Sequence, residues 1–523
     1  MKKRVFCLIL AAMFLQAMAG CGNAAGGGEE PADETAAQTE QAETPQDQSG
    51  SADSGLKTLD YSVKTDYQGQ WNDDYSMQTV SCEYDQIYLA DESQKALNGL
   101  NSALTAYNEQ VEKESKEEYS RLQKQFEEFL GQNSKPDVMY TLKNRIYMVR
   151  GDDAAASILR VTDEYGGGPH PFTIFSAVSY DSQTGQKLKL EDVITDTGRF
   201  QELIEDRLVN GYPELKGDLE TEGLMEEMTW TLGYQGIDVW YSAGSLASYA
   251  AGPLYAQILF SEDRKLFNEK YASAPAAYTI PMSDSLPLYY DLEGKGEAVQ
   301  IDAGGQGYQD DYYEKVVVTC GKDSAGSEAW AYEVRPMLIH TKDGKNYIYA
   351  ETTSDNDYRT LFTYEIGKDH VKETGELSGT GLAFGKDYMN RIMITDPENF
   401  SLETRINALS TYAGRQKCHV GKDGVPVPEH DYYDILFPAE LIMKTDMEFS
   451  TLDKNLKESG KTVVPKGSVL TFLRTDGKSW VDFQVKNDDA AYQVRVHYDD
   501  SGWPVMVNGQ DAETIFDGMI YAG

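Results

Sequence analysis

The chain has 523 residues, of which 86 are acidic and 47 are basic, and its formal net charge is −39. This charge excludes non-specific binding of nucleic acids and docking on anionic lipid headgroups, because both need a basic surface. It favours cationic partners through the long-range field, although solubility alone explains acidity in many secreted proteins.

The first 20 residues predict a secretory signal peptide. A basic start, Lys2 to Arg4, precedes an apolar run from Val5 to Ala17 that is too short to span a bilayer comfortably. The run ends in Met18-Ala19-Gly20-Cys21, which resembles the lipobox of bacterial lipoproteins. The resemblance implies cleavage before Cys21 and lipid attachment to its sulfur, which would anchor the protein on the extracellular face of the cytoplasmic membrane. The alternative is plain secretion with an incidental cysteine.

Residues 21–55 contain no aromatic, large aliphatic or basic residue. Such a segment buries too little apolar surface to offset the entropy of ordering. We therefore expect a disordered acidic tether, extended by self-repulsion.

The cysteines do not form a disulfide framework. Three of them remain beyond the signal region, namely Cys82, Cys320 and Cys418, which is an odd number in separate regions. At most one pair is expected, and Cys320 with Cys418 is the more plausible choice.

The sequence predicts neither a metal site nor a cofactor site. Residues 418–431 hold the dipeptides Cys-His and His-Asp, but no second cysteine pair completes a zinc centre. The glycine pattern at 379–385 lacks the βαβ context of a dinucleotide site.

The region 56–275 is predicted to be an α+β domain pair. Residues 60–89 alternate and are rich in aromatics, which favours strands. An apolar stripe from Leu97 to Phe129, at spacings of three and four, predicts one long helix that ends near Gly131.

Four strand-like segments follow, at 139–149, 156–165, 172–181 and 186–194. Helices are then predicted at 199–212 and 224–232, and further strands at 236–244 and 254–262. One long helix on an antiparallel meander is the expected architecture.

The stretch Tyr165–Phe172, YGGGPHPF, joins two predicted strands. A phosphate-binding loop needs a helix N-terminus behind it, and a strand follows here instead. The two prolines restrict the backbone and display His170 on a stiff connection. No nucleophile or ligand cluster accompanies His170, so we expect a structural or recognition role and not a catalytic one.

Several motifs in this region resemble a paired extracellular domain of Gram-positive bacteria. They are the segment KALNGLNSAL, the loop YGGGPHPF before SYDSQTGQKLKLEDV, and LASYAAGPLYAQILF. This pair forms the outer part of lysozyme-sensing anti-sigma factors related to RsiV and precedes the catalytic domain of some peptidoglycan deacetylases.

The resemblance covers roughly residues 56–275. It places Gly167, Gly168 and His170 on the family motif Tyr-x-Gly-Gly-Ala-His, and Tyr249, Ala250 and Gly252 on Tyr-Ala-x-Gly. The chain departs from both relatives, because it lacks their sigma-binding and transmembrane segments and the Thr-Phe-Asp-Asp motif of the deacetylases. Sensing and deacetylation are therefore not carried over whole.

Residues 280–435 are predicted to be a β-rich domain. The stretch around Asp291, Glu293 and Glu297 resembles the calcium loops of propeller-type repeats. Lys295 occupies an expected ligand position, and its ammonium group opposes calcium binding. We expect a structural turn without metal.

The segment 436–523 has short strands and tight turns, and it resembles a bacterial SH3-like barrel. Such barrels often bind glycans or peptides in secreted proteins. Trp480 and Trp503 are candidates for a binding groove, or they belong to the core.

Together these features predict a lipid-anchored surface protein that acts as a non-catalytic binding module. The expected partner is a cationic wall-degrading protein such as lysozyme, or a cell-wall glycan. The partner-contact candidates are Gly167, Gly168, His170, Tyr249, Gly252, Trp480 and Trp503. The alternatives are a cell-wall or glycan-modifying enzyme with an unidentified site, and a scaffold in an envelope complex.

Overall fold

The structure is a computed structural model, which describes residues 54–522 except 73–76, 133–137, 169, 216–222, 308–311, 386–388, 437–439 and 487–490. The predicted signal peptide, Cys21 and nearly all of the predicted tether lie outside the described residues. The described part is mostly β, in several largely antiparallel sheets, with one long helix near its start. No helix among the described residues has the length and apolar character needed to cross a membrane.

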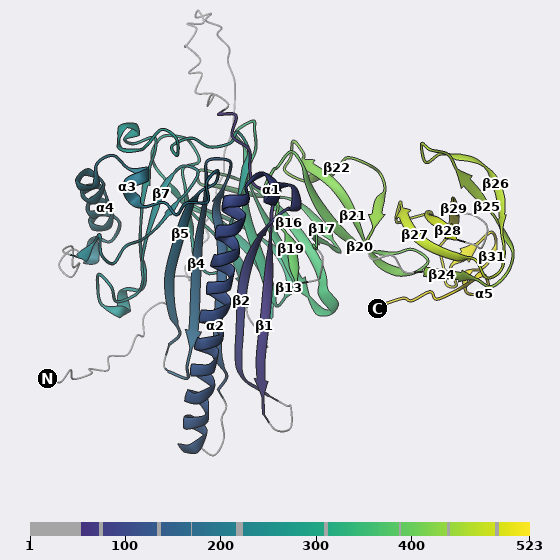
Figure 1. The fold of residues 1–523 in the computed structure, drawn as a ribbon, viewed down its shortest axis with the longest axis horizontal. Coiled ribbons are helices and arrows are strands. Elements are labelled where there is room, and N and C mark those ends of the chain that lie inside the picture. The colour runs from purple at the N-terminus through teal and green to yellow at the C-terminus, as the bar shows by residue number, and fades with distance from the viewer. Residues whose placement is uncertain are drawn as a thin grey trace, which may run out of the picture. The chain divides into compact units, whose positions relative to one another are not determined.

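The first sheet has six strands in the order β19-β1-β2-β3-β4-β5. The long helix α2 (Asn98–Gln132) runs along one face of this sheet, as predicted from its apolar stripe (Figure 1). The strands are β1 (Tyr61–Trp71), β2 (Gln78–Leu89), β3 (Tyr140–Gly151), β4 (Ala155–Tyr165), β5 (Phe172–Asp181) and β19 (Asn390–Ile392).

The expectation of a purely antiparallel meander is wrong at one junction, because β2 and β3 pair in parallel. Parallel neighbours need a crossover connection, and α2 supplies it. The parallel pairing covers only Val80–Tyr84, after which the two strands diverge. Beyond that point a side chain of α2 bonds to the backbone of β2. Asn108 accepts from the Ile87 N–H at 3.0 Å and donates to the Ile87 carbonyl at 2.7 Å.

Beside this sheet lies a smaller layer built from residues 190–260. Helix α4 (Thr197–Gly211) packs its apolar face, Phe200, Ile204 and Leu208, against a three-stranded sheet. The strands of that sheet are β6 (Thr229–Leu232), β7 (Gly236–Tyr241) and β8 (Leu254–Leu259).

Two sequence predictions in this layer are wrong. The expected helix at 224–232 is a turn followed by β6, and the expected strand at 186–194 contains the short helix α3 (Leu190–Val193). Thr229–Leu232 pairs with β7, and Leu188, Leu190 and Val193 pack into the core of this layer. The spacing of apolar residues within each segment therefore does not decide its secondary structure.

Strands β9 to β17, which span residues 278–378, form two sheets that share one core. One sheet contains β9 (Tyr278–Pro281), β14 (Glu333–His340), β15 (Asn346–Ser354), β16 (Tyr358–Gly367) and β17 (His370–Ser378). The other contains β10 (Leu288–Tyr290), β11 (Val299–Gln306), β12 (Tyr313–Cys320) and β13 (Asp323–Ala331).

Sheet pairing crosses both boundaries that we placed between the folded regions. Strand β19 belongs to the region 280–435 but pairs with β1. Strand β23 (Tyr433–Ile435) pairs with β21 (Thr411–Val420) on one side and with β27 (Val469–Thr475) on the other. The described residues from 54 to 522 accordingly form one compact unit.

A fully buried ion pair lies at the end of β3. Arg150 Nε donates to Asp152 Oδ2 at 2.8 Å, and neither side chain is exposed to solvent. The other guanidinium nitrogens donate to the main-chain oxygens of Gly233, Tyr271 and Ser273 at 3.3, 2.6 and 2.8 Å. One side chain thus connects the first sheet, the turn before β7 and the segment that leads into β9.

We predict that Arg150→Met lowers the free energy of unfolding by about 3–5 kcal/mol, because it leaves Asp152 buried without a counter-charge. Urea denaturation measures this loss. Arg199→Met is the matched control: Arg199 pairs with Glu202 at 3.1 Å on an exposed surface, and its loss is expected to cost less than about 1 kcal/mol. Equal effects of the two variants would contradict a dominant role for Arg150.

Candidate functional site

Two motifs that are about 80 residues apart in the sequence meet on the surface. The Tyr249 hydroxyl donates to the Pro171 carbonyl at 2.8 Å, and the Tyr249 and Phe172 rings meet edge to face with centroids 5.7 Å apart. The structure therefore places Tyr249 against Pro171 and Phe172, which directly follow the predicted contact residue His170.

Glycines shape both segments. Gly167 has φ +76°, and a Cβ there would lie 2.6 Å from the Tyr140 ring, so no side chain fits. Gly252 also has positive φ, +75°, and it ends the 3₁₀ turn that carries Tyr249. Gly168 is half-buried, whereas His170 is exposed.

Large apolar side chains are exposed next to this contact. Phe172 is 53% exposed, Ile174 52% and Tyr249 42%. Phe172 and Ile174 lie on the same face of β5, because they are two residues apart in one strand. We call His170, Phe172, Ile174 and Tyr249 the Tyr249 surface. An apolar cluster of this kind is a typical protein-contact surface.

The two predicted tryptophans are in different environments. Trp480 is half-buried under the Arg495 guanidinium, which lies 3.7 Å from the ring centroid. Trp503 is 70% exposed and touches Tyr521 edge to face at 5.6 Å. No contact joins the two tryptophans among the described ring contacts, so a shared groove is not seen.

The side chain of Asp291 stabilises the turn at 291–297 by accepting hydrogen bonds from the backbone of the same turn. Asp291 Oδ1 accepts from the N–H groups of Gly294 and Lys295 at 2.8 and 3.3 Å, and Oδ2 accepts from Gly296 at 2.9 Å. Lys295 pairs with Glu293 at 2.8 Å. The carboxylate that would have been the first calcium ligand is thus engaged within the turn.

The suggested disulfide between Cys320 and Cys418 is absent. Both are free, buried thiols, and so is Cys82. Cys320 Sγ donates to the Gly367 carbonyl at 3.2 Å, and the two sulfurs belong to different core clusters.

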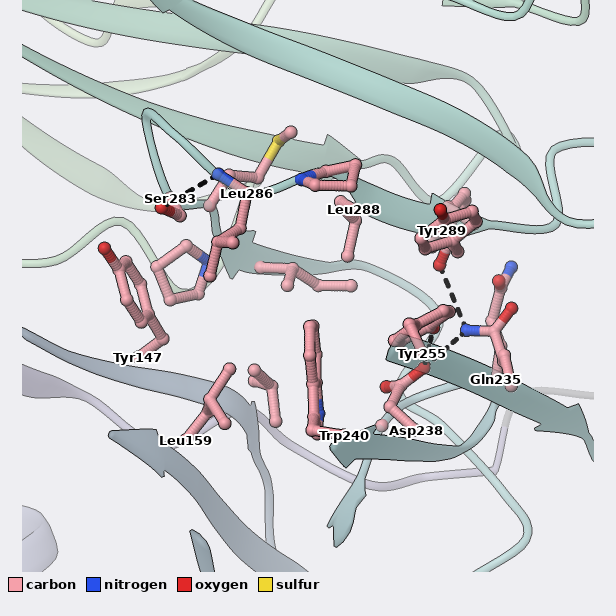
Figure 2. A pocket seen from close by; sticks show the side chains of 18 of the residues that line it. Tyr147, Leu159, Gln235, Asp238, Trp240, Tyr255, Ser283, Leu286, Leu288 and Tyr289 are labelled. Atoms are coloured by element: carbon pink, nitrogen blue, oxygen red, sulfur yellow. Dashed lines mark hydrogen bonds between the residues drawn. The ribbon is translucent and has the colours of Figure 1, made fainter. Parts of the chain in front are cut away.

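A pocket that the sequence did not predict lies between the first sheet, the three-stranded sheet and the segment 280–290 (Figure 2). Its interior is small, about 50 Å³, which is room for a compact group or a few water molecules. Most of its walls are apolar or aromatic, including Tyr147, Leu159, Trp240, Leu286 and Leu288.

Asp238 of β7 is the one carboxylate among the residues that line this pocket. Its Oδ1 accepts from the Tyr255 hydroxyl and from Gln257 Nε2, the latter at 2.8 Å. Burial raises the pKa of Asp238 to about 6, and the hydrogen bonds from Tyr255 and Gln257 only partly oppose this shift. The one signal for this site in the sequence is an aspartate inside the apolar run GIDVWY, a segment predicted to be a strand.

We predict that Asp238→Asn stabilises the protein at neutral pH by about 1–3 kcal/mol and has little effect at pH 4. The folded-state pKa lies above the usual value of 3.8, so the folded state holds the proton more tightly. Wild-type stability therefore falls as pH rises from about 4 to above 6, and the asparagine removes this loss.

Urea denaturation at pH 4 and pH 7.5 measures the difference. The control is Asp431→Asn, an exposed position with the same change of charge, which is expected to shift stability little at either pH. Equal destabilisation by Asp238→Asn at both pH values would contradict the buried, strained carboxylate.

Comparison with known proteins leaves the family open. No protein-family model matches the chain, and no curated protein matches it. Among solved structures the chain is similar to a DUF3298-family protein from Bacteroides fragilis NCTC 9343, with 16% identity over 41% of this chain and 96% of that one, at a TM-score of 0.31. It is also similar to a DUF3298-family protein from Pseudomonas aeruginosa PAO1, with 14% identity over 42% of this chain and 98% of that one, at a TM-score of 0.30. At these scores neither likeness assigns a fold or a function.

Proposed function

We propose that this protein is a lipid-anchored, non-catalytic binding module on the extracellular face of the cytoplasmic membrane, and that it contacts an extracellular protein through the Tyr249 surface. The observation that carries the proposal is the contact of Tyr249 with Pro171 and Phe172, which leaves the large apolar side chains of Phe172, Ile174 and Tyr249 exposed around one hydrogen bond. Exposed aromatic residues on a fixed backbone are typical of recognition surfaces.

Membrane attachment is supported by the signal sequence and Cys21. Two or more acyl chains hold a protein firmly at a bilayer, whereas a single chain does not. The acidic residues that follow Cys21 would let the folded part reach away from the membrane.

The partner's chemistry follows from charge and from the resemblance to lysozyme-sensing domains. A protein of net charge −39 attracts a basic protein. Attraction between exposed charges is screened beyond about 8 Å in physiological salt, so specific binding also needs an apolar contact. The Tyr249 surface supplies that contact, and lysozyme is the basic protein of choice for the test.

The C-terminal strands have a separate role in this proposal. We assign β24 (Glu440–Met443) to β32 (Phe516–Asp517) to the SH3-like barrel that the sequence resembles. Trp503 is its exposed aromatic residue and the contact point for a glycan or peptide.

We predict that lysozyme binds the mature, soluble Cys21→Ser protein in physiological salt, and that the double change Phe172→Ser with Tyr249→Ala weakens binding at least about tenfold. Isothermal titration calorimetry measures both affinities. Trp503→Ala, which removes an exposed ring elsewhere, is expected to leave the affinity unchanged. The proposal fails if no heat appears at tens of micromolar protein, or if heat appears only at low salt.

We predict that Cys21→Ser releases the protein from the membrane into the medium, because the acyl anchor is lost. Fractionation of cells that express the wild-type protein or the Cys21→Ser variant measures this release. A Cys82→Ser variant, which changes a buried thiol in the folded part, is expected to stay in the membrane fraction. Retention of the Cys21→Ser protein in washed membranes would refute lipidation.

A further inference from the structure

The carboxylate of Asp238 has no counter-charge. Its hydrogen-bond donors, the Tyr255 hydroxyl and the Gln257 amide, are both neutral, and none of the salt bridges among the described residues includes Asp238. A buried carboxylate without a cation is costly, and proteins usually pair it. The pocket therefore contains a negative charge that the described part of the chain does not neutralise.

Gln257 presents a second unsatisfied group. Its Nε2 donates to Asp238 Oδ1 at 2.8 Å and to the Tyr289 carbonyl at 3.0 Å. Both acceptors are oxygens, so the amide cannot be turned around without placing oxygen against oxygen. Its Oε1 is buried and receives no hydrogen bond. A buried acceptor without a donor indicates a missing partner.

Aromatic rings surround these two groups. Trp240 and Tyr255 meet edge to face at 4.8 Å, and Tyr255 stacks on Tyr289 at 4.2 Å (Figure 2). Ring faces attract cations. A Cβ at Gly233 would lie 3.2 Å from Asp238 Oδ2, so the glycine leaves room beside the carboxylate.

The pocket shares a wall with an open cleft. Tyr255, Gln257 and Tyr289 line both spaces, and the cleft holds about 750 Å³. Its charged walls are formed by Glu214, Glu262, Glu297 and Arg207. Among the described residues Arg207 pairs with Glu262, and Lys368 pairs with Glu297 at 3.1 Å. Glu214 is the lining carboxylate that lies in none of the described ion pairs, and it favours a positively charged ligand.

We propose that Asp238 and Gln257 bind the primary ammonium group of a linear aliphatic amine, such as a diamine or a polyamine, whose methylene chain runs past Tyr255 and Tyr289 into the cleft. An ammonium group brings the positive charge that Asp238 lacks and three N–H donors, one of which suits Gln257 Oε1. The tyrosine rings cover the methylene groups. A neutral ligand would leave the carboxylate unpaired, and an anion would be repelled.

We expect Asp238 to set the pH dependence of amine binding at this site. The other titratable groups that line the pocket are tyrosines, and burial raises the pKa of Tyr147, Tyr234, Tyr255, Tyr289 and Tyr290 above 10. Among the described residues, the cleft adds Glu214, Glu262, Glu297, Arg207 and Tyr212, and Lys368 pairs with Glu297. Asp238, with a pKa of about 6, is therefore the group expected to gain a proton between pH 7.5 and pH 5.

The test is a titration of the mature, soluble Cys21→Ser protein with 1,4-diaminobutane in physiological salt, followed by NMR line broadening and calorimetry. We expect saturable binding of the diamine and none of 1,4-butanediol, which has a similar length and no charge. The affinity is expected to fall about tenfold from pH 7.5 to pH 5, because Asp238 becomes protonated.

Variants separate the site from general attraction to an acidic protein. Asp238→Asn keeps the shape of the side chain and is expected to abolish binding, and Gln257→Met is expected to weaken it. Asp431→Asn removes the same charge at an exposed position and is expected to leave the affinity unchanged.

Three results would overturn the proposal. They are equal binding of the diamine and the diol, unchanged affinity in Asp238→Asn, and binding of a short lysine peptide without binding of the free diamine. The wild-type pH profile decides the question even if a variant folds poorly. Because lysozyme is not used, failure here leaves the function proposed for the Tyr249 surface intact.

Discussion

The guanidinium of Arg150 is the interaction on which the arrangement of the pocket depends. It donates to Gly233, which precedes the strand that carries Asp238, and to Tyr271 and Ser273, which lead into β9. Since β3 itself contributes Tyr147 and Val149 to the pocket, one side chain holds three of its walls in place. The buried pair with Asp152 fixes the orientation of this guanidinium.

The two buried charges, Arg150 and Asp238, differ in how well their surroundings compensate them. Arg150 is surrounded by acceptors from three segments, so its burial is compensated. Asp238 lies close to Gly233 in the sequence, yet neutral donors alone surround it, and burial raises its pKa. The cation Arg150 has its hydrogen-bond partners, whereas the anion Asp238 lacks a counter-charge. Keeping Asp238 buried therefore costs stability. Such a cost is common at binding sites.

The sequence predicts those helices and strands whose pattern of apolar residues lies within one element. The apolar stripe of α2 and the strand-like segments of β3, β4 and β5 are predicted correctly, because each pattern lies within one element. The parallel pairing of β2 with β3 was missed, since strand direction depends on the crossover and not on alternation. The contact between Tyr249 and Pro171 joins segments about 80 residues apart, and spacing does not reveal it. Asp238 was visible as a polar residue in an apolar strand, but Tyr289 and the segment 280–290, which complete its surroundings, come from another sheet.

The pairing of β19 with β1 has a consequence for how the chain reaches its folded state. Residues 390–392 pair with Ser62–Lys64 at the start of the edge strand, more than 300 residues after β1 begins. Until that part of the chain has been synthesised and has folded back, Ser62–Lys64 present their outward N–H and C=O groups as an open edge. A fragment that ends near residue 275 would keep this edge permanently and could recruit strands from other chains. Proteolysis or truncation in the later region would thus affect the solubility of the first sheet without touching any residue before 275.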